Sequence, residues 1–419
     1  MIPGWLTPLF LFQVATLAMR APVRQLPLPT GAFPVGRTSF HWTDAFRADP
    51  FEASAETHRE IVVFAWYPAA PAVKARPAPY FPDIAAIARA IGDSAIREEF
   101  GSATDAVLSG QIASLAAETP PLASTARRFP ILLFSHGFGE SSLTYAAQLA
   151  DLASQGYVVF AVEHPHDAFA VAMANGRVVP FAAAAWDTAL ATPGGAVRYQ
   201  LAQVPIRAAD LRFALDRITM LAGAGSPFAG HLDLARVGVF GHSLGGVAAA
   251  AACREDTRFR ACLNEDADDA GRPYDGGATA PPILQPFAFF ATGHSIYVSP
   301  RTPQPDNSAL ARMKLTRVQY DSIVDLYQRN QDAAMASFPA GAWEIMAESP
   351  AFTHRTFIDL RTLQAEDDSS FTRQAAYLDV IRRYVRAFFD RTLNVAADSV
   401  LDHIGVVDSL LTVRRFPAR

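Results

Sequence analysis

Short, near-continuous apolar runs alternate with longer amphipathic stretches over the middle of this chain. The runs occupy residues 131–134, 157–162, 237–240, 261–263 and 286–291. Such runs are typical of strands that are buried on both faces of a parallel sheet. The stretches between them have apolar residues at helical spacing, at 142–155, 206–221 and 244–253. Strands that alternate with helices predict an α/β fold with a mostly parallel central sheet flanked by helices.

Three further segments complete the predicted fold. Residues 61–67 are β-branched and aromatic, which predicts a strand, and residues 374–389 have one apolar helical face. Residues 301–341 interrupt the alternation with several prolines, followed by a predicted helix at 316–333. We expect this helical insertion to be surface decoration rather than a cap, because long insertions cost a fold little.

Composition excludes several classes of protein. Half of the 419 residues are hydrophobic, which is enough for a sizeable core and excludes a disordered chain. The net charge is −5 and no long basic stretch occurs, so nucleic acid is a poor candidate partner. Cys253 and Cys262 belong to no CxxC motif or Cys/His cluster of the kind that binds zinc. We therefore expect both to be buried free thiols.

The N-terminus contains an apolar stretch, residues 5–18, that is too short to span a bilayer. Its length fits the apolar part of a signal peptide, and Thr16-Leu17-Ala18 resembles a cleavage site. No Lys or Arg precedes it, so a helix packed on the domain is the alternative. We favour export, which predicts a secreted or periplasmic protein, whereas the packed helix fits a cytoplasmic one. Contact with a lipid surface is a third interpretation of this stretch.

The motif Gly241-His242-Ser243-Leu244-Gly245-Gly246 stands between the predicted strand at 237–240 and the helix that follows. A serine in a sharp strand-to-helix turn exposes its hydroxyl, and the flanking glycines leave room for that turn. The helix N-terminus also favours the negative charge that develops in acyl transfer. Ser243 is therefore the candidate nucleophile of an α/β-hydrolase. A glycine-rich turn without chemistry is the alternative.

An earlier predicted strand runs into Ser135-His136-Gly137-Phe138-Gly139. In α/β-hydrolases the loop after such a strand supplies one oxyanion-hole donor, and the residue after the nucleophile supplies the other. The candidate donors are therefore the backbone N–H groups of Phe138 and Leu244. We expect His136 to orient this loop through hydrogen bonds rather than to transfer protons.

The nucleophile needs a base and an orienting acid, which in this fold follow it in the order acid, then histidine. The predicted strand at 261–263 is followed by four competing carboxylates, those of Glu265, Asp266, Asp268 and Asp269. The choice among them stays open at this point. The later histidines are His294, His354 and His403. Their order along the chain favours His354, because His294 ends a predicted strand and His403 lies beyond the last long helix.

Several stretches, in this order, resemble the platelet-activating factor acetylhydrolase family in its plasma and intracellular type II branch. The matching stretches are LPTG at 28–31, ILLFSHGFGE and its continuation at 131–167, VGVFGHSLGG and its continuation at 237–267, PFAFFATGHS at 286–295 and FTHRTFIDL at 352–360. The resemblance covers roughly residues 27–390 apart from the insertion. Its most specific part is the block around the nucleophile.

The resemblance implies specific roles for residues of this chain. Ser243 matches the nucleophile, Asp266 the triad aspartate and His354 the triad histidine. The register comes from the RFR segment at 258–260 and from the H-x-x-F-x-D pattern at 354–359. The family usually has aromatic and apolar residues after the aspartate, whereas this chain continues with Ala-Asp-Asp.

The resemblance also implies an organisation and an activity. A catalytic domain over 27–395 contains the 301–341 insertion or cap, a signal or anchor segment occupies 1–26, and 396–419 form a C-terminal extension. The expected reaction removes a short or oxidised acyl group from a lipid ester, such as the sn-2 acetyl group of platelet-activating factor. The family needs no calcium, other metal or cofactor for this reaction.

Three other functions remain open. A general carboxylesterase or polyester hydrolase would use the same triad. A non-catalytic binding protein would keep the fold without the chemistry. A metal-dependent hydrolase would use His164, His166 and Asp167 in the segment EHPHD. We favour a polar loop at the edge of the sheet as the interpretation of that segment.

Overall fold

The computed structural model describes residues 23–416 apart from 53, 55, 72–74, 193–194, 268–281, 293–304, 313–315, 323–324, 326–338, 340, 397–399 and 407–409. Its strands are β1 (Val35–Ala48), β2 (His58–Pro68), β3 (Pro77–Pro79), β4 (Ala113–Glu118), β5 (Phe129–Ser135), β6 (Val158–Glu163), β7 (Ala170–Ala172), β8 (Val178–Pro180), β9 (Leu232–His242), β10 (Ala261–Glu265), β11 (Phe287–Thr292), β12 (Trp343–Ala347), β13 (Gly405–Val406) and β14 (Leu411–Arg415). Its α-helices are α1 (Ile84–Ile91), α2 (Asp93–Phe100), α3 (Thr104–Leu108), α4 (Ala146–Ser154), α5 (Ala183–Leu190), α6 (Gly195–Leu221), α7 (Leu244–Glu255), α8 (Asn307–Arg312), α10 (Leu360–Leu363) and α11 (Asp368–Thr392).

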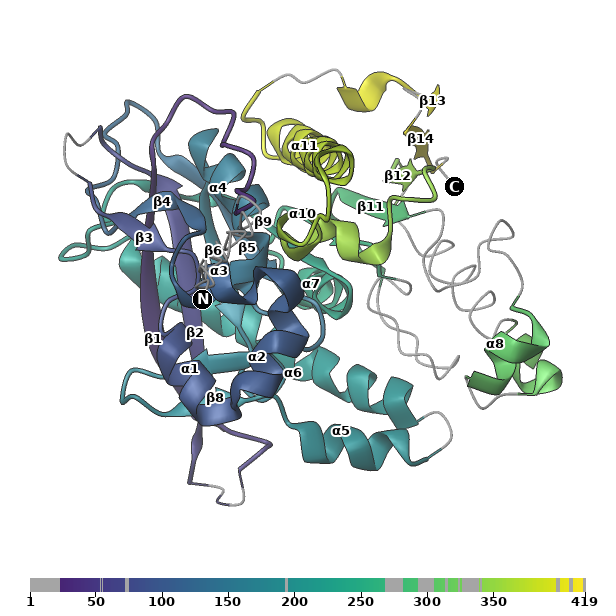
Figure 1. Cartoon of the computed structure of the whole chain (residues 1–419). Helices are drawn as coiled ribbons and strands as arrows, with labels where there is room; N and C mark the ends of the chain where they lie inside the picture. The colour runs from purple at the N-terminus through teal and green to yellow at the C-terminus, as the bar shows by residue number, and fades with distance from the viewer. Residues whose placement is uncertain are drawn as a thin grey trace, which may run out of the picture.

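Most of the strands join one twelve-stranded sheet, whose order is β13-β14-β12-β11-β10-β9-β5-β6-β2-β1-β4-β3 (Figure 1). From β6 through β5, β9, β10 and β11 to β12, every neighbouring pair runs parallel. β2 joins β6 and β1 antiparallel, and β14 joins β12 antiparallel at the other end. The mostly parallel central sheet that the sequence predicts is confirmed.

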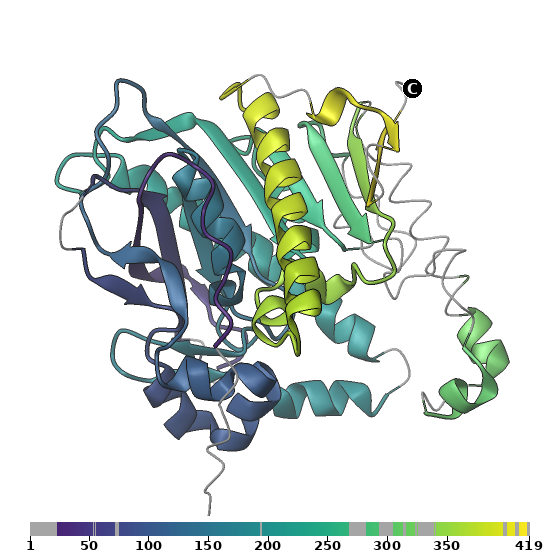
Figure 2. The ribbon, with the colours of Figure 1, turned by 45° about the horizontal axis from the view of Figure 1, so that its top comes forward.

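Alternate side chains of the central strands enter two separate hydrophobic cores. On β5, Leu132 and Phe134 pack with residues of α4 and α11, whereas Ile131 and Leu133 pack with residues of α6 and α7. Figure 2 shows α11 lying across one face of the sheet. Because helices cover both faces, strands such as β5 need apolar side chains at every position. This is the physical origin of the continuous apolar runs in the sequence.

The predicted elements differ from the observed ones mainly at their ends. The predicted helix at 142–155 is a 3-10 turn, η2 (Ser142–Tyr145), followed by α4. The predicted helix at 206–221 is the second half of α6, which begins at Gly195 and contains Pro205. Proline normally disfavours a helix interior, so the pattern of residues did not predict that the helix extends upstream.

The expected insertion lies in the connection between β11 and β12, which are neighbouring parallel strands of the sheet. α8 and the helical residues 317–322 lie within it, and α8 stands beside the main body in both views (Figures 1 and 2). Part of the predicted 316–333 helix falls outside the described residues. The expected extension at 396–419 adds β13 and β14 to the edge of the same sheet.

The apolar stretch at 5–18 also lies outside the described residues. Among the helices that the structure describes, none is both long and apolar enough to cross a membrane.

The expectation of two free thiols is wrong, because the structure joins Cys253 and Cys262 in a disulfide bond. Cys253 lies in the last turn of α7 and Cys262 lies on β10. The short return between these elements brings the two Cα atoms to 6.3 Å, which is within the normal range for a disulfide. The sequence spacing alone does not reveal this approach.

Candidate active site

The predicted site residues meet at the carboxyl edge of the parallel sheet, where ligands bind in open α/β folds. β5 ends shortly before Phe138, β9 ends directly before Ser243, and β10 ends directly before Asp266. His354 begins the 3-10 turn η3 (His354–Phe357), in the segment that follows β12. Four stretches that are distant in the sequence are therefore brought to one edge of the sheet.

Ser243 occupies the sharp turn that the motif predicts. Its φ of 54° and ψ of −128° lie in a region that non-glycine residues rarely adopt. Its N–H donates to the carbonyl oxygen of Glu265 at 2.8 Å, which fixes the turn to β10. A Cβ on Gly241 would collide with the carbonyl group of Gly245, and a Cβ on Gly245 would collide with that of Ser135. Both glycines are therefore required by the close packing of this turn.

His354 and Asp266 form a hydrogen-bonded pair. His354 Nδ1 lies 2.7 Å from Asp266 Oδ2, and the two side chains are 25% and 1% exposed. The N–H and hydroxyl groups of Thr292 also donate to Asp266, at 2.7 and 3.0 Å. These donors fix the carboxylate, which in turn holds the proton of His354 on Nδ1. The Nε2 atom of His354 is left as the basic nitrogen.

The neighbouring carboxylate, Glu265, belongs to a different environment. Its side chain accepts a hydrogen bond from Gln148 rather than from His354. Burial raises the pKa of Glu265 to about 8, although the Gln148 hydrogen bond opposes this shift and the Asp266 charge adds to it. Glu265 is therefore mainly protonated near neutral pH. Of these two candidates, only Asp266 contacts His354.

The other candidates do not bear on this choice. Asp268, Asp269 and His294 fall outside the described residues. His403 is exposed and follows the 3-10 turn η4 (Val400–Asp402) after α11, and no contact with the other predicted site residues involves it in the described part of the chain.

The loop that carries Phe138 is held through the preceding residue, Gly137. The carbonyl oxygen of Gly137 accepts hydrogen bonds from His136 Nδ1 at 2.7 Å and from Arg207 Nη2 at 3.4 Å. His136 Nε2 accepts the backbone N–H of His164 at 3.3 Å, so the proton of His136 is on Nδ1. In a trans peptide the carbonyl and the N–H point in opposite directions, so these contacts aim the N–H of Phe138 away from Arg207. His136 makes the orienting hydrogen bonds that we expected of it.

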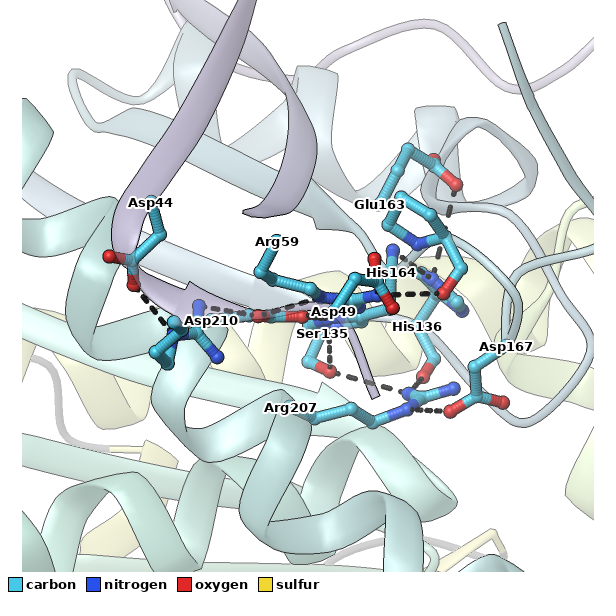
Figure 3. A network of polar contacts seen from close by, with 12 residues as sticks. Asp44, Asp49, Arg59, Ser135, His136, Glu163, His164, Asp167, Arg207 and Asp210 are labelled. Atoms are coloured by element: carbon cyan, nitrogen blue, oxygen red, sulfur yellow. Dashed lines mark hydrogen bonds and ion pairs between the residues drawn. The ribbon is translucent and has the colours of Figure 1, made fainter. Parts of the chain in front are cut away.

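A buried network that the sequence did not reveal lies behind this loop (Figure 3). Ser135 Oγ lies 3.0 Å from His164 Nε2, and His164 Nδ1 lies 2.9 Å from Asp210 Oδ2. Arg59 donates to Asp210 through Nη2 at 2.8 Å, and Arg207 donates to Asp167. Ser135, His164 and Asp210 are all fully buried. This second series of Ser, His and Asp is therefore closed to substrate and supports the end of β5.

The charges in this network are settled by burial and pairing. Burial lowers the pKa of His164 to about 4 despite its hydrogen bond to Asp210, so the ring is neutral. Burial alone would raise the pKa of Asp210, but the charge of Arg59 and the hydrogen bonds from His164 and Arg59 hold it well below its usual range. The Asp210 carboxylate therefore accepts from His164 Nδ1, and His164 Nε2 accepts from the Ser135 hydroxyl.

The side chains of the segment EHPHD contact different partners. His164 and Asp167 belong to the network just described, whereas His166 stacks on Phe51 with ring centroids 4.8 Å apart. Across the described residues, no group of three or more His, Cys, Asp and Glu side chains is arranged to hold a metal ion. The geometry agrees with a polar loop at the edge of the sheet.

Comparison with known proteins shows which class of enzyme this chain resembles. A family model described as platelet-activating factor acetylhydrolase, isoform II, matches residues 21–178. A protein of Arthroderma benhamiae named "Probable 1-alkyl-2-acetylglycerophosphocholine esterase" is 28% identical over 287 residues, which are 64% of this chain and 67% of that protein. The chain is a carboxylic ester hydrolase that is similar to the platelet-activating factor acetylhydrolases in these matched regions.

Two further similarities support this relationship. The platelet-activating factor acetylhydrolase of Canis lupus familiaris is 30% identical to this esterase over 161 residues, about a third of each protein at 34% and 36%. Among solved structures, a ferulic acid esterase from Streptomyces cinnamoneus matches with a TM-score of 0.66 and 27% identity, covering 94% of this esterase and 99% of that chain. The expected α/β-hydrolase fold is confirmed by this match.

Proposed function

We propose that this esterase cleaves short acyl esters through a triad of Ser243, His354 and Asp266. The observation that carries the proposal is the 2.7 Å contact between His354 Nδ1 and Asp266, beside the strained turn of Ser243. His354 takes the proton of Ser243 as its Oγ attacks the ester carbonyl, and Asp266 stabilises the imidazolium. The backbone N–H groups of Phe138 and Leu244 donate to the oxyanion of the tetrahedral intermediate.

The second half of the reaction uses the same groups. His354 returns the proton to the leaving alcohol, which frees the acyl-enzyme. Water then attacks the acyl group with His354 as base, and the carboxylic acid product leaves Ser243 unmodified. We assign all of these steps to one catalytic domain, with proposed bounds of 27–395.

For the substrate we propose the sn-2 acetyl group of phospholipids like platelet-activating factor, cleaved without calcium. This choice is supported by the names of the matching family and of the fungal and canine relatives. Cleavage without calcium is supported by the proposed mechanism, in which each proton transfer and each charge has a protein group assigned to it. The proposed partner of this site is therefore a lipid ester substrate.

The substrate proposal predicts a clear order of activities in the presence of EDTA. The wild-type enzyme is expected to hydrolyse a 2-acetyl ether phospholipid with a kcat/KM at least about tenfold above that for the 2-palmitoyl analogue, because a site specific for an acetyl group has to exclude added methylene groups. Release of acetate or palmitate measures both rates. Full activity on a soluble acetate ester with none on either phospholipid would contradict the lipid proposal and leave a general carboxylesterase.

A second candidate, an esterase for aromatic acyl groups, is favoured by one feature of the oxyanion loop. Phe138 lies in an aromatic cluster with Phe181, Trp186 and Tyr199, at ring-centroid distances of 5.2, 4.8 and 6.1 Å. Such a half-buried aromatic surface next to an oxyanion donor offers a stacking partner for a planar acyl group. A solved structure with the same fold is named a ferulic acid esterase, which agrees with this candidate.

Replacement of Trp186 by alanine tests this candidate. If an aromatic acyl group stacks on the cluster, the variant is expected to lose about fivefold in kcat/KM for methyl ferulate and less than about twofold for methyl acetate, since a stacked pair contributes about 1 kcal/mol. Trp42→Ala is the control, because Trp42 packs against Phe40 on β1 and is distant from the site in the sheet order. Equal losses on both esters would assign Trp186 to packing alone.

A further inference from the structure

We propose that Tyr145 and His242 are positioning residues. They hold the oxyanion loop, the Ser243 turn and His354 at fixed positions relative to one another. The inference rests on the proposed function, since it concerns the residues to which that function assigns the chemistry. Tyr145 ends the 3-10 turn η2 and His242 is the residue before Ser243. Neither residue is given a chemical step of its own.

A continuous chain of three hydrogen bonds joins the three segments. The backbone N–H of Gly137, next to Phe138, donates to Tyr145 Oη at 3.1 Å. Tyr145 Oη lies 2.8 Å from His242 Nδ1. His242 Nε2 lies 3.0 Å from the backbone carbonyl oxygen of His354. This series of hydrogen bonds therefore begins beside one proposed oxyanion donor, includes the residue before the proposed nucleophile and ends on the proposed base.

The direction of each bond follows from the chemistry of its ends. A carbonyl oxygen only accepts, so His242 Nε2 must carry a proton and donate to His354. In a neutral ring Nδ1 is then unprotonated and accepts from the hydroxyl of Tyr145. The oxygen of that hydroxyl remains free to accept from Gly137. Every donor and acceptor is satisfied in this one arrangement. Only the bond between Tyr145 and His242 could run the other way, and that reversal would leave the buried hydroxyl hydrogen of Tyr145 unpaired, which is costly.

The surroundings hold this chain in a single geometry. Tyr145 is fully buried and His242 is 2% exposed. The His242 ring packs against those of His354 and Phe357, with centroids 4.5 and 5.1 Å away. A Cβ on Gly137 would come within 3.1 Å of Tyr145 Oη and 3.2 Å of His242 Nδ1, so these groups pack directly against the loop backbone. Small displacements of any member would move the others.

The neutral state of His242 also suits its place beside His354. Burial, followed by the positive charge that His354 carries when it is protonated, lowers the pKa of His242 well below its usual value. His242 therefore adds no second positive charge next to the imidazolium that forms on His354 during acyl transfer. A neutral ring can fix the backbone of His354 without opposing its protonation.

Tyr145→Phe removes one oxygen atom and breaks two bonds of the chain. We expect kcat for a soluble acetate ester to fall about 10- to 100-fold with KM changed less than about threefold, because misplaced reacting groups slow chemistry more than binding. The matched control is Tyr157→Phe, which removes the same atom from another fully buried tyrosine, whose Oη donates to Asp390 at 2.7 Å. This variant should lose stability but keep kcat within about twofold.

Two results would overturn the inference. One is a folded Tyr145→Phe enzyme with wild-type kcat, and the other is an equal loss of kcat in Tyr157→Phe.

If Tyr145→Phe does not fold, the ¹⁵N spectrum of histidine-labelled wild type tests the inference instead, with the His242 signals assigned by their loss in His242→Gln. We expect a proton on Nε2 and a hydrogen-bonded, unprotonated Nδ1, and the opposite tautomer excludes the proposed chain. Wild-type activity in Ser243→Ala would instead show that the proposed function is wrong.

Discussion

Ser243→Ala is expected to lose about 10⁴- to 10⁶-fold in kcat for a soluble acetate ester, because no acyl-enzyme can form without the nucleophile. The variant should keep its fold, since alanine is smaller than serine and the strained turn is held by the Ser243 N–H bond to Glu265 and by the flanking glycines. Initial rates of ester hydrolysis measure the loss. Labelling with a fluorophosphonate probe should disappear at the same time.

Ser135→Ala is the matched control for this experiment. Ser135 also faces a histidine that is backed by an aspartate, but all three residues are fully buried. The control should therefore keep its label and lose no more than about tenfold in activity, because it loses one buried hydrogen bond and no reacting atom. If the probe labelled Ser243→Ala but not Ser135→Ala, the nucleophile would have to be reassigned.

Asp266→Asn is expected to lower kcat by about 10⁴-fold with little change in KM. The asparagine oxygen can still accept from Thr292, so the local fold should persist. Its NH₂ group, however, would donate to His354 Nδ1 and move the ring proton to Nε2. The ring then has no basic nitrogen facing Ser243. The kinetics on a soluble ester and a thermal unfolding curve separate lost chemistry from lost stability.

Asp359→Asn makes the same change at another buried aspartate near the histidine loop. Burial raises the pKa of Asp359 to about 8, against the hydrogen bond from Ala147, so its side chain is mainly neutral near neutral pH. A neutral amide in its place should leave kcat within about threefold of wild type. A loss of less than tenfold in Asp266→Asn would contradict the assignment of Asp266 as the orienting acid.

The sequence predicted the parts of this fold whose cause is local. The central strands are buried on both faces and so appear as apolar runs, and the turn at Ser243 needs glycines at fixed positions. β1 was missed because it pairs mainly with β2 at one side of the sheet and has many exposed side chains, which makes its pattern irregular. The boundaries of α6 were missed because its first half contains Pro205.

The supporting residues could not be predicted because their roles depend on long-range packing. Arg207 and Asp210 lie three positions apart on α6, and polar residues of such a helix usually face solvent. Here they face inward and bind residues that follow β5 and β6. Likewise, order along the chain favoured His354 but left four carboxylates open, and only the contact between His354 and Asp266 separates Asp266 from Glu265 geometrically.

The disulfide between Cys253 and Cys262 has a consequence for how the protein should be produced. Both sulfur-bearing residues are fully inaccessible to solvent in the folded chain. Thiol–disulfide exchange needs direct attack by a thiolate on sulfur. Neither glutathione nor an oxidant can therefore reach this pair once the domain has folded. The oxidation state is therefore decided while the chain folds. Protein that folds in a reducing host would retain two thiols between the nucleophile helix and the strand that leads to Asp266, and later oxidation would require transient unfolding.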